Sequence, residues 1–397
     1  MNAAVNQPSD DAPLKGLRVV EFGQFIAAPA AAQMLSDLGA DVIKVEPPSG
    51  DAARVVGWAQ DAYGPMFTAY NRGKRSVVLD LRHEASRAQA IQLAVGADVV
   101  LQNARPGAMN KLGLGAAALM ALAPRLVYGQ VSGFGQDGPA SIRAGFDIAA
   151  QAESGMMSLN GELGGEPVRV GFTVVDAMAA QILTNGVLAA LIRRGVSGRG
   201  SLIDVSLIDV AVASLANAWA EYRLSGKMPL RRGNGQASSA PAADVICTQD
   251  GMVVVSAYTE DHFPKLCAAI GRPELASDPR FARNIARVEN RAALIETLSQ
   301  AMGHMTSDEV CDLLARAGVV AGAIRDMSDV HAGRAGVSAD LFVHVAAEGR
   351  PPVEIPGIPM RIDGVVRGAG RLPALGEHTA DVLAELAADS HSGSHSN

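Results

Sequence analysis

Short segments rich in β-branched residues alternate with longer segments rich in alanine and leucine over the first half of the chain. This alternation constrains the fold more than any other feature. We expect strands at residues 17–22, 40–45, 76–81, 97–101, 126–132 and 201–205. We expect helices between several of them, at 30–38, 84–95 and 116–122. Strands that alternate with helices form parallel sheets, so the pattern predicts an α/β fold with a parallel sheet covered on both faces.

The composition is typical of a folded globular protein, with 48% hydrophobic and 19% charged residues. The length of 397 residues predicts about two domains. A formal net charge of −7 argues against a general affinity for nucleic acid. The cysteines, Cys247, Cys267 and Cys311, form neither a disulfide framework nor a metal-binding pair, which indicates a reducing compartment.

The first residues and the apolar runs bear on where the protein resides. Residues 1–16 are mostly polar and lack the pattern of a signal peptide. No uninterrupted apolar run reaches the ~18 residues that a membrane span needs. We therefore expect a cytoplasmic protein that binds neither membranes nor nucleic acid and that has no metal site.

A change of character near residue 225 divides the chain. An apolar helix is expected to end at about residue 224, and the following segment, 225–245, is rich in glycine, proline and serine. A strand at 252–256 and helices at 262–270 and 291–301 come next. We expect a small α+β domain over 226–330. The large domain is expected to combine 14–225 with 331–397, which includes a final helix at 377–386, and residues 1–13 and 388–397 are expected to be flexible tails.

Asp176 stands directly before a long apolar segment that predicts a helix over 177–194. The segment ends in Arg193-Arg194-Gly195, a cationic last turn followed by a glycine stop. An aspartate in front of such a helix is ordinarily its N-cap. Because the helix dipole and free N–H groups favour negative charge, we expect this carboxylate to be ionised, near its reference pKa of about 3.9.

Short motifs recur in a fixed order along the chain: LRVVEF at 17–22, LGADVIKVE at 38–46, NRGKRS at 71–76, RPG at 105–107, GFGQDGP at 133–139, GFTVVD at 171–176 and LGEHT at 375–379. In this order and spacing they resemble the class III coenzyme A transferases, a group related to formyl-CoA transferase and to the carnitine CoA-transferase. The resemblance covers about residues 14–386. It implies a Rossmann-like parallel sheet in the large domain and an interlocked homodimer, in which each subunit is a ring threaded by the other.

The resemblance implies that Asp176 is the nucleophile. Its carboxylate would attack the thioester of a donor such as succinyl-CoA and form an aspartyl anhydride, which CoA converts to an enzyme thioester. The acceptor acid then reverses the sequence. Fixed backbone donors are expected to stabilise the oxyanions. The candidate donors are the free N–H groups after Asp176 and a substrate loop made of Gly233, Asn234, Gly235 and Gln236.

The resemblance also implies where coenzyme A, the cosubstrate, would bind. Aligned on the family, its pocket falls at Ile26, Ala27, Leu79, Arg82, Asn103, Arg105, Lys111, Arg143 and Phe146. Arginine and lysine are suited to phosphate groups. No other cofactor is implied, and the expected partners are an acyl-CoA, a small carboxylic acid and a second copy of this chain.

Three departures from the family pattern bear on the acceptor. Ile26 replaces the glutamine of formyl-CoA transferase, and Phe146 replaces a tyrosine near the thioester. Residues 237–241 replace the glycine run of the enzymes that act on oxalate. These changes remove polar and flexible features, so we expect a less polar or longer acid than oxalate, such as a C4–C6 dicarboxylate.

Two other functions remain open. An α-methylacyl-CoA racemase shares the family fold, but such enzymes place a histidine base at the position of Phe146, just before Asp147, and phenylalanine accepts no proton. A racemase would exchange α-protons of its substrate with solvent without any acceptor acid. A CoA-binding module without turnover would bind CoA and form no covalent adduct at Asp176.

Overall fold

The computed structural model describes residues 11–392 except 59–60, 236–242, 258, 364 and 367–369. The chain forms two compact units. The first unit comprises Met1–Ser154, Val170–Leu215 and Ser338–Asn397. The second comprises Gly155–Arg169 and Ala216–Val337.

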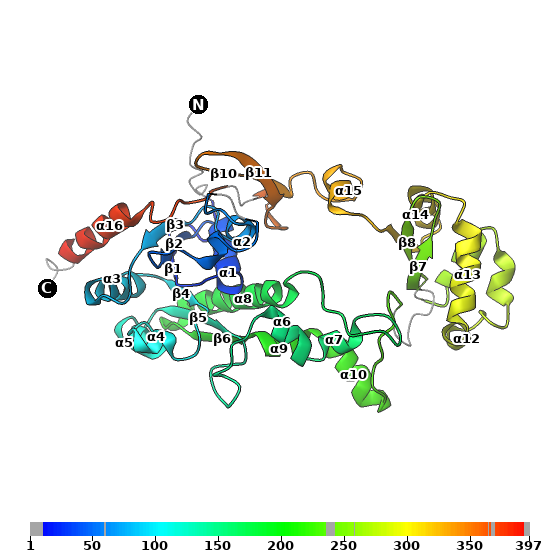
Figure 1. Ribbon diagram of the computed structural model, residues 1–397, viewed down its shortest axis with the longest axis horizontal. Coiled ribbons are helices and arrows are strands. Elements are labelled where there is room, and N and C mark those ends of the chain that lie inside the picture. Colours follow the sequence, from blue (N-terminus) through cyan, green and yellow to red (C-terminus); the bar gives the residue numbers. More distant parts are fainter. Residues whose placement is uncertain are drawn as a thin grey trace. The chain divides into compact units, whose positions relative to one another are not determined.

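A six-stranded parallel sheet is the centre of the first unit (Figure 1). Its order is β3 (Arg75–Val78), β2 (Asp41–Glu46), β1 (Arg18–Glu21), β4 (Val99–Gln102), β5 (Val127–Ser132) and β6 (Leu202–Ser206). All five neighbouring pairs are parallel, which confirms the predicted α/β fold and the position of each strand. The strand order reverses between β1 and β4, and open parallel sheets bind ligands at such a point, beyond the carboxyl ends of the strands.

Helices cover both faces of this sheet. On one face the core joins strand residues such as Val20 and Val100 to α3 (Glu84–Val95), α4 (Ala108–Lys111), α5 (Ala116–Leu122) and α16 (Thr379–Ser392). On the other face lie α1 (Ala27–Asp37), α8 (Val174–Ser197) and α9 (Leu207–Ser214). The apolar residues of the strands are therefore buried on both sides, as their nearly continuous hydrophobicity predicts.

The helix α8 is long and apolar, and among the described residues it alone meets length and composition criteria for a membrane span. Core helices also meet these criteria, so the match is weak support for a span. Its residues Ala179, Leu183 and Val187 are completely buried. They belong to a helix that packs against α1, β5, β6 and α9, which is typical of a core helix.

Shorter elements complete the first unit. The helices are α2 (Pro65–Tyr70), α6 (Asp147–Glu153) and the 3₁₀ turn η1 (Ala52–Arg54). An antiparallel hairpin, β10 (Phe342–Ala347) and β11 (Arg350–Pro356), pairs with β14 (Gly370–Arg371), and β12 (Arg361–Ile362) pairs with β13 (Val365–Val366). Val345 and Leu372 pack against Phe67 of α2 in a small separate core, which fastens the hairpin to the unit.

The second unit is an α+β structure with its own core. Its antiparallel sheet has the order β7 (Ala243–Cys247), β8 (Met252–Ser256) and β9 (Val320–Ala323). Its other elements are α7 (Met156–Leu159), α10 (Ala216–Ser225), α11 (His262–Ala269), η2 (Pro273–Ser277), α12 (Asn284–Glu289), α13 (Arg291–Met302), α14 (Ser307–Arg316) and α15 (Met327–His331). Phe263, Phe281 and Leu294 are among its completely buried residues.

The helix that crosses residue 215 and the final helix differ from the sequence prediction. The apolar helix expected to continue to about residue 224 is divided at Leu215 into α9 and α10. The final helix continues past Leu386 to Ser392, and residues 393–397 lie outside the described part of the chain.

Candidate active site

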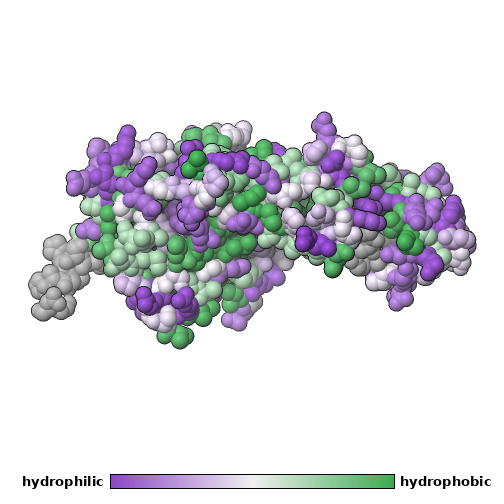
Figure 2. Space-filling model, turned by 90° about the horizontal axis from the view of Figure 1, so that it is seen from below, coloured by the Kyte–Doolittle hydropathy of each residue, from purple (hydrophilic) through white to green (hydrophobic). Residues whose placement is uncertain are grey.

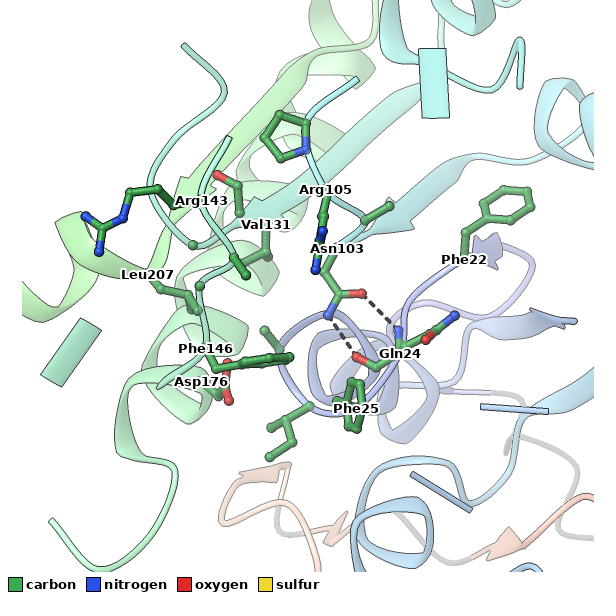
Figure 3. Close-up of a pocket in the computed structure, with 18 residues that line it drawn as sticks. Phe22, Gln24, Phe25, Asn103, Arg105, Val131, Arg143, Phe146, Asp176 and Leu207 are labelled. Atoms are coloured by element: carbon green, nitrogen blue, oxygen red, sulfur yellow. Dashed lines mark hydrogen bonds between the residues drawn. The ribbon is translucent and has the colours of Figure 1, made fainter. Parts of the chain in front are cut away.

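Asp176 lies in the first turn of α8 and lines a cavity of about 370 Å³ (Figure 3). The helix begins at Val174, and Thr173 is its N-cap. The prediction that Asp176 caps a helix beginning after it is therefore wrong. Two β-branched residues, Val174 and Val175, precede the aspartate inside the helix, a composition that gives little sign of a helix start.

The cavity lies beyond the carboxyl ends of β1, β4 and β5, at the reversal of strand order. Its walls come from the loops after these strands, the start of α1, the segment before α6, and the first turns of α8 and α9. The lining residues are Phe22, Gln24, Phe25, Ile26, Ala27, Asn103, Ala104, Arg105, Pro106, Val131, Ser132, Gly133, Arg143, Ala144, Gly145, Phe146, Asp176 and Leu207.

The loop between β1 and α1 is held in place at each peptide. The Lys44 ammonium donates to the Gly23 carbonyl over 2.9 Å. The Asn103 side chain accepts from the Gln24 N–H at 2.9 Å and donates to the Gln24 carbonyl at 2.8 Å, as the dashed lines of Figure 3 show. Asp51 accepts from the N–H of Phe25 at 3.2 Å. These bonds hold Phe25 at φ 62°, a left-handed conformation that costs free energy for a bulky residue.

A buried group of charges lies beneath this loop. The Lys44 ammonium lies 2.9 Å from carboxylate oxygens of both Glu21 and Asp51. The Lys74 ammonium lies 2.7 Å from the other Glu21 oxygen. Burial lowers the pKa of Lys74 to about 8, although the Glu21 carboxylate opposes the change. Because these side chains are paired inside the protein, they give the loop a rigid polar base.

Two glycines let the segment before α6 approach the end of β5. A Cβ atom on Gly133 would lie 2.7 Å from the Cα of Gly145, so only glycines permit this contact between the two backbones. The contact places Phe146 in the cavity wall. Its ring meets that of Phe25 edge-on, with centroids 5.9 Å apart and planes at 83°.

A carboxylate of α6 accepts hydrogen bonds from backbone N–H groups at the start of α8. One oxygen of Asp147 accepts the N–H of Val175 at 2.7 Å and that of Asp176 at 3.3 Å. The N–H of Ala177 donates to the Thr173 carbonyl at 3.1 Å. The expected free N–H groups beside Asp176 are therefore already bonded, and this part of the prediction is wrong.

The ionisation of Asp176 also differs from the prediction. Burial of the side chain, and then the negative charge of Asp147, raise the pKa of Asp176 from its ordinary value of 3.8 to about 7. The dipole argument failed because burial of the carboxyl group disfavours its charged form, and Asp147 adds a second negative charge at the same helix end. Asp176 also raises the pKa of Tyr70, whose own burial is the larger cause.

The structure gathers some of the predicted CoA residues and separates others. Ile26, Ala27, Asn103, Arg105, Arg143 and Phe146 line the cavity together with Asp176. The side chain of Leu79 is buried in the core. Arg82, which is paired with Asp80, and Lys111 are exposed, and neither lines the cavity.

The two cavity arginines are engaged differently. Arg143 forms an ion pair with Glu153, and its guanidinium lies 4.4 Å from the centre of the Phe134 ring. Figure 3 shows this guanidinium directed away from Asp176 and the side chain of Arg105 directed toward Asn103. Arg105 is thus the better placed of the two for a phosphate inside the cavity.

The predicted substrate loop belongs to the second unit. Gly233 has φ 58°, and its N–H donates to the Gly161 carbonyl at 2.9 Å. A Cβ atom on Gly235 would collide with the guanidinium of Arg291. Asn234 is exposed, and Gln236 lies outside the described residues.

Sequence reasoning missed residues that shape the cavity without a motif of their own. Gln24 and Phe25 lie beside the predicted Ile26, and proximity in sequence was the available signal. Asp51 follows the LGADVIKVE motif, but only the fold brings it to the N–H of Phe25. The sequence shows Asp147 only as the residue after Phe146. Its hydrogen bond to the N–H of Val175 joins α6 to α8 and depends on the fold.

Comparisons with known proteins identify the family of this chain. The sequence profile of CoA-transferase family III matches residues 14–379. A succinate–glutarate CoA-transferase from Agrobacterium fabrum is 35% identical over 396 residues, which cover 96% of this chain and 97% of that protein. An acetyl-CoA:oxalate CoA-transferase from Acetobacter aceti is 36% identical, with 95% of this chain and 96% of that protein covered.

A solved structure gives the same result. The crystal structure of a CAIB/BAIF family protein from Brucella suis matches with a TM-score of 0.82 and 37% identity. The match covers 94% of this chain and 99% of that chain. The chain belongs to CoA-transferase family III, whose members are enzymes that use CoA thioesters as substrates.

Proposed function

We propose that this enzyme transfers CoA from an acyl-CoA donor, such as succinyl-CoA, to a carboxylic acid through covalent bonds to Asp176. The observation that carries this proposal is the position of one carboxylate. Among the described residues that line the cavity, Asp176 is the only acid. Its raised pKa makes the ionised form a stronger nucleophile than an ordinary carboxylate, because nucleophilicity increases with basicity.

The reaction consists of exchanges at carbonyl carbons. An oxygen of Asp176 attacks the donor thioester, the C–S bond breaks, and CoA leaves as a thiolate from the aspartyl anhydride. The thiolate attacks the aspartyl carbonyl, which gives the enzyme thioester and releases the donor acid. The acceptor carboxylate attacks this thioester, and the returning thiolate then forms the new acyl-CoA. The thioester bond energy is retained if water is kept out of the cavity.

The oxyanion donors must come from outside the first turn of α8, because Asp147 and Thr173 already accept the N–H groups there. We propose that the substrate loop contributes them. The N–H groups of Gly233 and Gly235 are bonded to Gly161 and Arg232. The resemblance to the family alone assigns this role to the side-chain amides of Asn234 and Gln236, and the Asn234 side chain is exposed.

The proposed acceptor is a C4–C6 dicarboxylate. Phe25, Ile26 and Phe146 make the cavity wall near Asp176 apolar, which suits a chain of methylene groups better than the adjacent carboxylates of oxalate. The relative from Agrobacterium fabrum is named for succinate and glutarate, two acids of this class. The relative from Acetobacter aceti is named for oxalate, so both acids belong in the same assay.

We propose that the working form is an interlocked homodimer. Apolar side chains remain exposed on α8, among them Ile192 at 75% and Val196 at 92%. Figure 2 shows hydrophobic surface, in green, at several places among the hydrophilic patches of one face. A partner chain would cover such residues. Light scattering is expected to give twice the mass of the chain at every concentration at which the protein is folded.

We further propose that the enzyme acts in the cytoplasm. Its three cysteines are free, and Cys247 is exposed, a state that a reducing compartment preserves. Fractionation of the source cells with an antibody against the protein tests this proposal, and recovery with a membrane or secreted fraction would contradict it.

Covalent trapping tests the nucleophile. The protein is incubated with succinyl-CoA and glutarate, treated with hydroxylamine or borohydride, digested and analysed by mass spectrometry. We expect the adduct on the peptide that contains Asp176, and we expect Asp176→Ala to lose transfer while it still binds CoA. Asp381→Ala is the matched control, because Asp381 is an exposed acid in the first turn of another helix. Full activity of Asp176→Ala would overturn the proposal.

A further inference from the structure

Two side chains of α6, one helical turn apart, hold the segment that carries Asp176. Asp147 is 3% exposed and Gln151 is completely buried. The Gln151 amide donates to Asp147 over 2.5 Å, and its oxygen accepts the N–H of Val170 at 2.9 Å. With the bonds from Val175 and Asp176 to Asp147, α6 fixes both ends of residues 170–176.

The Asp147 carboxylate accepts hydrogen bonds from neutral groups only, within the described residues. Its bonding partners are two backbone N–H groups and one amide, and within the described residues it forms no ion pair. The charge therefore acts on Asp176 without a cation to cancel it. A like charge nearby disfavours ionisation of a carboxyl group.

Several other titratable groups lie on the elements that pack around the start of α8. They are Asp37 on α1, paired with Arg72; Tyr70 on α2; Glu153 on α6, paired with Arg143; Tyr128 on β5, bonded to Leu114; Asp204 on β6; and Asp209 on α9. Within the described part of the chain, Asp147 is the charged group that raises the pKa of Asp176, after burial of the carboxyl group itself, which is the larger cause.

We propose that Asp147 is a positioning residue that fixes the start of α8 and destabilises the free Asp176 carboxylate relative to its acylated forms. This inference rests on the proposed nucleophilic role of Asp176. When Asp176 forms the anhydride or the thioester, its negative charge is lost, and CoA or the acid carries the charge away. The repulsion by Asp147 then disappears, so each attack by Asp176 is favoured.

The variant Asp147→Asn separates charge from shape. Its amide oxygen can still accept the two N–H groups, but the negative charge is gone and the new NH2 group replaces the oxygen that accepts from Gln151. We expect the titration midpoint of Asp176 to move down by about 1 pH unit. We expect kcat to fall about 10-fold or more, with the KM for acyl-CoA nearly unchanged. Asp209→Asn, which removes an exposed acid from α9, is expected to change neither.

The midpoint is measured without catalysis. A water-soluble carbodiimide modifies the protonated carboxyl, and mass spectrometry of the Asp176 peptide across pH 4–9 gives its midpoint. An unchanged midpoint in Asp147→Asn would overturn the proposal. Gln151→Leu is the complementary variant, because it removes the amide that donates to Asp147 and leaves the negative charge of Asp147 in place. It is expected to lower kcat with the midpoint in place, and a shifted midpoint there would also count against the proposal.

The outcomes separate this inference from the proposed function. If the wild type forms no adduct at Asp176, the nucleophile proposal and the catalytic part of this inference both fail. If the adduct forms and Asp147→Asn keeps a normal midpoint and rate, only this inference fails. Should Asp147→Asn not fold, Asp147→Glu retains the charge and shifts its position. It is expected to keep a raised midpoint and to lose rate, and a full rate would overturn the positioning role.

Discussion

The Lys44 ammonium lies 2.9 Å from a carboxylate oxygen of Glu21, and both side chains are completely buried. The same nitrogen donates to the carbonyl of Gly23, so the ion pair supports the loop that carries Phe25 and Ile26. Burying an ion pair gives little net stability by itself. In this protein the ion pair fixes the conformation of the strained loop that lines the cavity.

Replacing Lys44 with methionine should destabilise the protein by about 3–5 kcal/mol, because Glu21 and Asp51 would keep buried charges without their shared cation. Chemical denaturation measures this change. Arg82→Ala removes an exposed member of an ion pair with Asp80 and should leave the free energy of unfolding nearly unchanged, because solvent screens such pairs. Equal effects of the two substitutions would show that burial of the Lys44 group has no energetic consequence.

The fold was largely readable from sequence because its signals are local. Each strand of the six-stranded sheet lies within or beside its predicted range, and α3 and α5 have the predicted bounds. Their apolar periodicity extends over enough residues to define an element. The short α6 was missed because seven residues contain too few turns to show a pattern, and it follows the irregular segment 133–146.

The site was readable only in part. Asp176 and most cavity residues came from family motifs, and the fold brings them together. The environment of Asp176 was not readable, because its main neighbour, Asp147, lies far away in the chain and reaches it through tertiary packing. A helix start predicts stabilised negative charge, whereas burial of the carboxyl group and a second carboxylate at that start reverse the effect.

Arg105→Ala should raise the KM for acyl-CoA about 10-fold with little change in kcat, because a charged hydrogen bond contributes about 1.5–3 kcal/mol. Arg105 lines the cavity, and Arg82 does not, although both align with CoA-binding positions of the family. Arg82→Ala should therefore change the KM less than about twofold. Steady-state kinetics with varied succinyl-CoA decide between the two, and a larger effect of Arg82→Ala would contradict the observed placement.

Phe146→Ala should weaken the preference for short acids, because it removes the ring that meets Phe25 across the cavity wall. We expect kcat/KM for a C8 dicarboxylate to rise about 10-fold relative to glutarate, the range that a few methylene groups confer. Phe172 is the control, since it is 63% exposed and does not line the cavity. The comparison fails if Phe172→Ala changes the ratio as much as Phe146→Ala does.

The raised pKa of Asp176 predicts how its removal affects stability at different pH. In the unfolded chain this carboxyl titrates at its ordinary value of 3.8, and in the folded protein at about 7. Between these values the folded state binds more protons, so stability decreases as pH increases through this window. The cost is absent below pH 3.8 and complete above about pH 7.

Asp176→Asn removes this cost while it keeps the shape of the side chain. At pH 8 the variant should be more stable than the wild type by about 1–3 kcal/mol, after allowance for partial exposure of the carboxyl group. The difference should decrease steadily toward pH 5, because the wild-type carboxyl becomes protonated. Urea unfolding at both pH values measures it. An equal gain at the two pH values would mean that Asp176 is already ionised at pH 5 at no extra cost, which would contradict its raised pKa.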